Sequence, residues 1–255
     1  MAHRLGPCDD VPAMRTLALV TTIFAVTSPA HAGRVTDALG APIRKLFQRL
    51  AAKKQDRVFH AGGVVYRGTI RDAQGERPAI VRLSRGAGKP ADQSDILGVA
   101  IKDTLAGAEQ DYLLVSAKAQ TGFRARLAKF TGQFAGQSIS SLTSYRKDGL
   151  VGPITGELPA TFRTPLDVDA PGVGPARQSF QLTLHQQAFF RTRASTAIAD
   201  VTVHFDEPMA PSEIAGLRMS PWHEGGGVHP VGFINWTRKF AYPGSQAGRG
   251  LPAEK

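Results

Sequence analysis

Residues 56–85 read DRVFHAGGVVYRGTIRDAQGERPAIVRLSR and contain two strand-like runs, Gly63–Ile70 and Ala79–Ser84. Asp, Gly and Pro residues separate the runs, which is the pattern of two strands joined by a turn. Two glycines follow shortly after His60, and their missing side chains let a flat ligand or another backbone approach closely. This stretch therefore predicts a sheet whose first strand begins beside a histidine.

Further strand-like runs follow, at Leu97–Lys102, Asp111–Ser116, Ser179–Phe190 and Ala197–Phe205. The 27 glycines and 17 prolines indicate many turns, and 42% hydrophobic residues in a chain of 255 suffice for a substantial core. We predict an α+β fold with an antiparallel sheet or barrel at its centre. Residues 123–147 are expected to be helical or irregular, residues 164–178 a crossing loop, and the tail from Pro221 an ordered wrapping segment.

The N-terminus has the order of a targeting segment. Arg15 precedes the apolar run Leu17–Val26, and the triplet Ala30-His31-Ala32 provides a small-x-small cleavage site. We predict a signal peptide over residues 1–32, a true start at Met14, and export to the periplasm or beyond. A membrane anchor is the alternative, but the apolar run is short for a membrane span.

Residues 33–55 are predicted to form an amphipathic helical arm. Its apolar side chains recur at helical spacing, at Leu39, Ile43, Leu46, Phe47 and Leu50, and the other face is basic. The apolar stripe is expected to dock on the same protein or on a second subunit, with a membrane surface as the alternative.

Charge and cysteine content exclude several classes of protein. Without residues 1–32 the chain keeps 31 − 2 = 29 basic and 21 − 2 = 19 acidic residues, a net charge of +10. These charges are scattered, so no nucleic-acid partner is expected. The single Cys8 precedes the predicted cleavage site, which excludes disulfides and thiolate ligands from the mature protein. Core packing, a cofactor or a homo-oligomer must then supply stability.

The common motifs of hydrolases, nucleotide-binding loops and zinc sites are missing from the sequence. The segment RKFAYPGSQAGR, residues 238–249, instead places Arg238 four residues before Tyr242. Because a phenol titrates near pH ~10, a fixed positive charge beside it favours the phenolate, which is the form that binds ferric iron.

Three segments together resemble the catalase superfamily, and in particular its small catalase-related members. The matching residues around the first strand are Arg57, His60, Ala61, Gly63 and Gly68. The second segment, VRLSRGAG at 81–88 followed by DILGVAIK at 95–102, matches through Arg82 and Ser84. The third matches through Arg238, Phe240, Tyr242, Pro243 and Arg249. The resemblance covers about residues 50–250 and implies a catalase-like barrel with flanking helices and a haem-binding domain over residues 56–255.

The resemblance also implies roles for individual residues. Tyr242 would ligate the iron of haem b, and Arg238 would hold its phenolate. His60 would be the distal acid–base, with Ser84 hydrogen-bonded to it. The remaining arginines, Arg57, Arg82 and Arg249, would pair with the haem propionates, since a guanidinium fork suits a carboxylate.

The implied function is an exported haem-dependent peroxidase or weak catalase that acts on hydrogen peroxide or organic hydroperoxides, with an unidentified electron donor. Two departures from the family pattern motivate an alternative. Val65 replaces a glycine, and Ser116 is the residue nearest the position of the family's distal asparagine. The alternative is a haem-free barrel that binds a lipid or another hydrophobic ligand.

Overall fold

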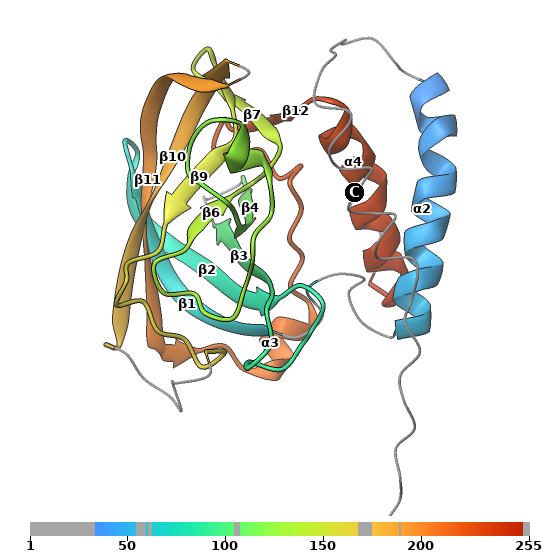
Figure 1. The fold of residues 1–255 in the computed structure, drawn as a ribbon. Helices are drawn as coiled ribbons and strands as arrows, with labels where there is room; N and C mark the ends of the chain where they lie inside the picture. The colour runs from blue at the N-terminus through green and yellow to red at the C-terminus, as the bar shows by residue number, and fades with distance from the viewer. Residues whose placement is uncertain are drawn as a thin grey trace, which may run out of the picture.

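The computed structural model describes residues 34–54, 60, 63–104, 108–167, 175–188 and 190–251. Its centre is an antiparallel barrel of eight strands, which closes because β2 pairs with both β1 and β3 (Figure 1). Around the barrel the strands are β1 (Gly63–Asp72), β2 (Gly75–Arg85), β3 (Asp95–Asp103), β4 (Gln110–Ser116), β6 (Ser138–Ser140), β9 (Ile154–Glu157), β10 (Arg177–Ala188) and β11 (Arg191–Pro208). The predicted α+β fold with an antiparallel barrel and flanking helices is confirmed.

Smaller elements complete the described chain. The short strand β5 (Phe130–Thr131) extends the sheet beside β3, and β7 (Ser144–Lys147), β8 (Leu150–Gly152) and β12 (His229–Val231) form a second sheet. The helices are α2 (Arg34–Lys54), a 3-10 turn η1 (Phe123–Arg126), α3 (Pro211–Ala215) and α4 (Phe233–Gly248). No helix among the described residues has both the length and the apolarity needed to cross a membrane.

Two predictions about segments were incomplete. Residues 123–147 begin with the turn η1 and are otherwise irregular, as one of the two predicted alternatives had it, except that they also contain the strands β5, β6 and β7. These strands have two to four residues, too few for an alternating pattern to show in the sequence. The tail is described from Pro221 to Leu251, and about half of that stretch is the helix α4, which its Gly and Pro content concealed; Pro243 lies inside this helix. The predicted signal, Arg57 and residues 168–174 of the crossing loop lie outside the described residues.

The two faces of the sheet formed by β2, β3 and β4 have different surroundings. Side chains such as Val81, Leu83 and Val99 are fully buried in the hydrophobic core. Because successive side chains point to opposite faces of a strand, Arg82 and Ser84 lie on the other face. The strand register places Arg82 beside Ala100 and Ser84 beside Gly98 on β3, and Leu113 and Val115 follow on β4. One face therefore builds the core and the other builds a floor on which helices can pack.

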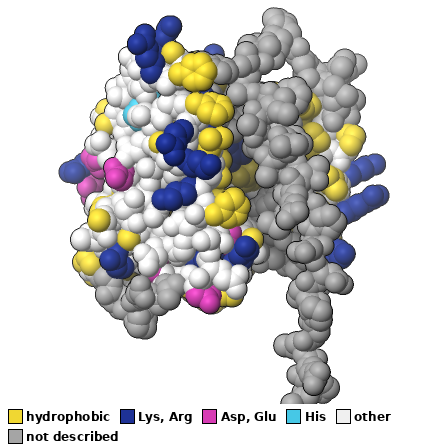
Figure 2. Space-filling model, viewed as in Figure 1, with side chains coloured by type: hydrophobic (Ala, Val, Ile, Leu, Met, Phe, Trp, Pro, Cys, Tyr) yellow, Lys and Arg dark blue, Asp and Glu magenta, His cyan; other side chains and the backbone are white. Residues whose placement is uncertain are grey.

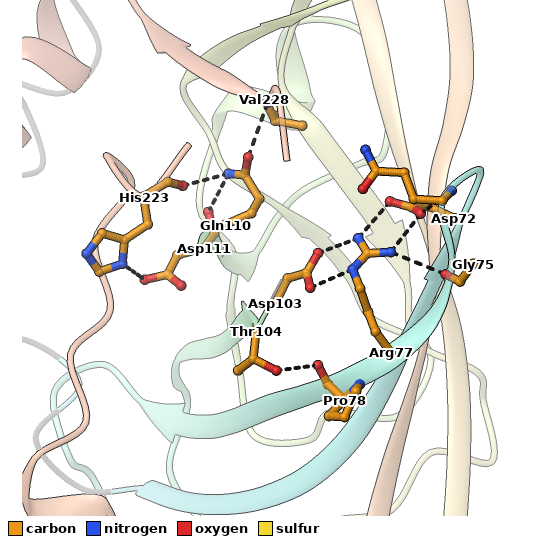
Figure 3. Close-up of polar contacts among 11 residues, drawn as sticks. Asp72, Gly75, Arg77, Pro78, Asp103, Thr104, Gln110, Asp111, His223 and Val228 are labelled. Atoms are coloured by element: carbon orange, nitrogen blue, oxygen red, sulfur yellow. Dashed lines mark hydrogen bonds and ion pairs between the residues drawn. The ribbon is translucent and has the colours of Figure 1, made fainter. Parts of the chain in front are cut away.

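Two partly buried polar networks hold this sheet and the chain after it (Figure 3). Arg77 forms paired hydrogen bonds with Asp103, at 2.8 and 2.5 Å, and with Asp72, at 2.8 Å each. The Arg77 hydrogen bonds lower the pKa of Asp72. In the second network the Gln110 amide donates to the His223 carbonyl at 2.9 Å and accepts from the Val228 backbone at 3.2 Å. The second network ties residues 223–228, which lead to α4, to β4.

Helix α2 packs side by side with α4, and the two helices are parallel (Figure 1). Glycines make the approach close: a Cβ on Gly244 would lie 2.4 Å from the Arg44 carbonyl oxygen, and one on Gly248 would lie 2.3 Å from the Gln48 carbonyl oxygen. On α2, a Cβ on Gly40 would overlap the Phe240 ring. The predicted arm thus lies against the C-terminal helix of its own chain.

Gly244→Val should lower the free energy of unfolding by about 1–3 kcal/mol, because a side chain there must push the backbone of α2 away. Thermal unfolding followed by far-UV circular dichroism measures the loss. The control is Gly216→Val, since no atom lies within 4 Å of a Cβ at Gly216. Equal melting temperatures for the two variants would contradict the close packing of the helices.

Lys and Arg side chains stand at several separate places on the face that Figure 2 shows, over the barrel and over the outer side of α2. On α2 the exposed residues include Lys45, Arg49 and Lys53 together with Leu46, which is 55% exposed. On this face the described Lys and Arg side chains thus stand at separate places.

Candidate functional site

A cavity of about 310 Å³ lies between the outer face of the sheet and helix α4, with Phe47 of α2 at its edge. Its volume is at the lower end of the range for small-molecule and cofactor sites. Strand residues such as Gly98, Ala100, Leu113 and Val115 form the sheet side. Six of the seven site residues predicted from the sequence line it: His60, Ser84, Arg82, Arg238, Tyr242 and Arg249.

On the sheet side, His60 and Ser84 form a pair. The Ser84 hydroxyl and the His60 Nδ1 are 3.0 Å apart, and the His60 backbone N–H donates to the Gly86 carbonyl at 2.9 Å. His60 has a φ of 55°, a left-handed conformation that is uncommon outside glycine and is often found at functional sites. The backbone therefore holds the imidazole at the cavity against a local conformational preference.

Gly98 makes room for this pair. A Cβ at this position would lie 2.5 Å from the His60 Nδ1 and 2.6 Å from the Ser84 hydroxyl. Only a residue without a side chain can therefore occupy position 98 while the two side chains keep their contact. Gly98 was not among the site residues predicted from the sequence, because its importance depends on the cross-strand register with Ser84.

Arg82 is buried beside the histidine, with 5% of its surface exposed. One of its terminal nitrogens donates to the His60 carbonyl oxygen. The guanidinium thus holds the backbone of His60 and at the same time lines the cavity, where it supplies positive charge.

On the helix side, Arg238 and Tyr242 form a second pair, one turn apart on α4. The Arg238 Nη2 donates to the Tyr242 hydroxyl oxygen at 3.1 Å, and the Arg238 Cζ lies 5.4 Å from the centre of the Tyr242 ring. A donor aimed at the phenol oxygen stabilises negative charge on it. The spacing of four residues that the sequence showed places both side chains on one face of the helix.

Arg238 is surrounded by hydroxyl and amide oxygens. Its Nη1 donates to the Thr143 hydroxyl at 3.2 Å and to the Asn235 side-chain oxygen at 3.3 Å. Burial by itself lowers the pKa of Arg238. The nearby phenol groups of Tyr242 and Tyr145 raise it by more, so the pKa of Arg238 lies above its ordinary value. Burial raises the pKa of Tyr145, which keeps that phenol neutral. The cavity therefore contains a permanent cation next to Tyr242.

Of the two remaining predicted residues, one lies in the described part of the chain. Arg249 follows the last turn of α4 and lines the cavity. Arg57 lies outside the described residues. No group of three or more His, Cys, Asp or Glu side chains in the described ranges has the geometry to hold a metal ion. A metal at this site would therefore depend on Tyr242 and on a group that brings its own ligands.

The two departures noted in the sequence do not lie in the cavity. Ser116 is fully buried; its hydroxyl donates to the Lys129 carbonyl at 2.6 Å and accepts from the Leu97 backbone at 3.0 Å. Ser116 does not line the cavity, whereas the adjacent Val115 does. Val65 is buried opposite Arg82 in the strand register and does not line the cavity. On β4, the side chains that line the cavity are those of Leu113 and Val115, which are apolar.

Comparison with solved structures identifies a similar fold in a fungal catalase. The match has a TM-score of 0.54 at 14% sequence identity, and it covers 81% of this chain and 62% of that one. The chain therefore has a catalase-like fold, and it spans less than two thirds of the length of the catalase it matches. No protein-family model and no curated protein matches the sequence.

Proposed function

We propose that this chain is an exported haem protein with peroxidase or weak catalase activity. One observation carries the proposal: the His60–Ser84 pair and the Arg238–Tyr242 pair lie on the two sides of a single cavity. The likeness of the fold to a catalase supports it. Ser84 of the first pair and Arg238 of the second are 238 − 84 = 154 residues apart in the sequence, so the meeting of the two pairs depends on the fold.

The residues of the cavity fit haem b. The phenol oxygen of Tyr242 is the candidate ligand for the iron, and Arg238 would stabilise its negative charge. Arg82 and Arg249 both line the cavity and would pair with the propionates, with Arg57 as a third candidate. The apolar side chains Leu113 and Val115 on the sheet side suit a flat hydrophobic ring. Haem would supply the redox chemistry on peroxide.

In this proposal His60 moves the proton of the substrate. The contact with Ser84 engages Nδ1, so Nε2 is the nitrogen that would take a proton from one peroxide oxygen and return it to the other. Arg82 and the Gly86 carbonyl hold the histidine backbone in place. The protein thus contributes orientation and proton transfer.

The apolar β4 side of the cavity, formed by Leu113 and Val115, favours organic hydroperoxides over hydrogen peroxide. Val115 lines the cavity, whereas the hydroxyl of the next residue, Ser116, is bonded to Lys129. We expect haem-loaded protein to have a higher kcat/KM for cumene hydroperoxide than for hydrogen peroxide, with a dye as electron donor. A clear preference for hydrogen peroxide would contradict the proposed effect of the apolar side chains on substrate choice. No turnover of either substrate would contradict the proposed activity.

The same apolar side of the cavity is the observation behind a second candidate function. A cavity with Leu113, Val115 and Phe47 in its lining can hold a lipid or another hydrophobic ligand without haem. Under this alternative the two polar pairs would have a structural role only. This alternative would be supported if the protein binds a fluorescent fatty acid and added haem does not displace it.

A further inference from the structure

Asn235 is a fully buried polar residue in the first turn of α4. Its side-chain nitrogen donates to the Ser144 carbonyl at 2.7 Å and to the Val231 carbonyl at 3.1 Å. These carbonyls belong to β7 and β12, which pair with each other. Its side-chain oxygen accepts a hydrogen bond from Arg238 at 3.3 Å. One amide therefore connects the second sheet to the arginine that contacts Tyr242.

The orientation of this amide is determined by its partners. Two carbonyl oxygens require a donor on one end, and a guanidinium requires an acceptor on the other. An amide meets both needs at once, whereas a carboxylate would meet only the second and an alkyl group neither. The indole N–H of Trp222 also donates to the Asn235 backbone carbonyl at 3.2 Å, which fixes the backbone at this turn.

We propose that Asn235 is a positioning residue for the Arg238–Tyr242 pair. It holds the guanidinium between itself and the Thr143 hydroxyl, so that Nη2 is directed at the phenol oxygen. Outer contacts of this kind tune the groups that hold a metal, and their loss typically costs 10–100-fold in affinity. The effect of Asn235 on haem binding rests on the proposed function, in which Tyr242 binds the haem iron. The effect of Asn235 on the orientation of Arg238 does not depend on haem.

Two substitutions separate positioning from anchoring. Asn235→Ala removes both ends of the amide, so it should destabilise the protein and release Arg238. Asn235→Asp keeps an acceptor for Arg238 but loses the donors to Ser144 and Val231, so it should destabilise the protein and leave Arg238 held. Thr237→Ala is the control, because among the described residues the Thr237 hydroxyl bonds to the Ile234 carbonyl within the same helix and to neither Arg238 nor Tyr242.

The first readout uses haem-free protein. Nitrogen-15 NMR of the Arg238 guanidinium should show restricted rotation in the wild type, in Asn235→Asp and in Thr237→Ala, and averaged terminal nitrogens in Asn235→Ala. The second readout is haem release to an excess of apomyoglobin. Release should be about 10–100-fold faster in Asn235→Ala and close to wild type in Asn235→Asp.

The outcomes are distinct. If Asn235→Ala and Asn235→Asp lower the melting temperature equally but leave the Arg238 signals as in the wild type, Asn235 is only an anchor and the proposal is overturned. If the wild type binds no haem, the proposed function fails, but the NMR comparison still decides whether Asn235 positions Arg238. If Arg238 is released while haem release stays unchanged, Asn235 has no role in holding the haem ligand.

Discussion

Tyr242→Phe should weaken the binding of haem by more than about 100-fold, because the variant loses the candidate iron ligand and keeps only the walls and arginines of the cavity. The ring of Phe fits the same space, so the melting temperature of the haem-free protein should change little. Absorbance spectra during titration with ferric haem measure the effect directly. The expected result is a Soret band and a phenolate-to-iron charge-transfer band in the wild type that are absent or strongly shifted in the variant.

Tyr66→Phe is the matched control for this experiment. Tyr66 packs edge-on against Phe205 in the barrel core and does not line the cavity, so its loss of a hydroxyl should leave the spectrum unchanged. An unaltered Soret band in Tyr242→Phe would show that Tyr242 is not the iron ligand, and would leave the Arg238–Tyr242 contact with a structural role.

His60→Ala should keep haem but slow peroxide turnover by about 10²–10⁴-fold, which is the usual contribution of a positioned acid–base group. A second variant guards against a backbone effect. Because Asn tolerates the left-handed conformation found at His60 better than most residues, His60→Asn should keep the local fold and show the same loss. Initial rates with cumene hydroperoxide and a dye, normalised to bound haem, provide the measurement.

His229→Ala is the control for His60. His229 contacts Glu224 at the surface and does not line the cavity, so turnover should remain at the wild-type level. Equal rates for His60→Ala and the wild type would remove His60 from the proposed mechanism while leaving haem binding intact.

The strands of the barrel could be predicted where they are long. β1 and β2 show alternating side chains and a short polar turn, and the structure pairs them from Gly63 with Ser84 to Asp72 with Gly75. The short strands, with two to four residues each, are β5, β6 and β9. Each is held in the sheet by hydrogen bonds to a longer neighbouring strand. Such strands have no pattern of their own in the sequence.

The site was predictable to the extent that its residues have local spacing. Arg238 and Tyr242 are one helical turn apart, and their contact follows from that spacing once α4 forms. Gly98 and Asn235 act through partners on other elements, so only the fold reveals them. That Val115 and not Ser116 lines the cavity likewise depends on the fold, since a shift of one residue in a strand moves a side chain to the opposite face. Gly244 and Gly248 likewise gain meaning only when α2 lies against α4.

The most direct test of haem binding is titration of the wild-type protein with ferric haem, followed by absorbance. We expect saturation at one haem per chain, with a Soret band and a charge-transfer band typical of a tyrosinate ligand that disappear in Tyr242→Phe. A protein that remains colourless after reconstitution and gel filtration would contradict it, and would leave a catalase-like barrel whose cavity serves another ligand.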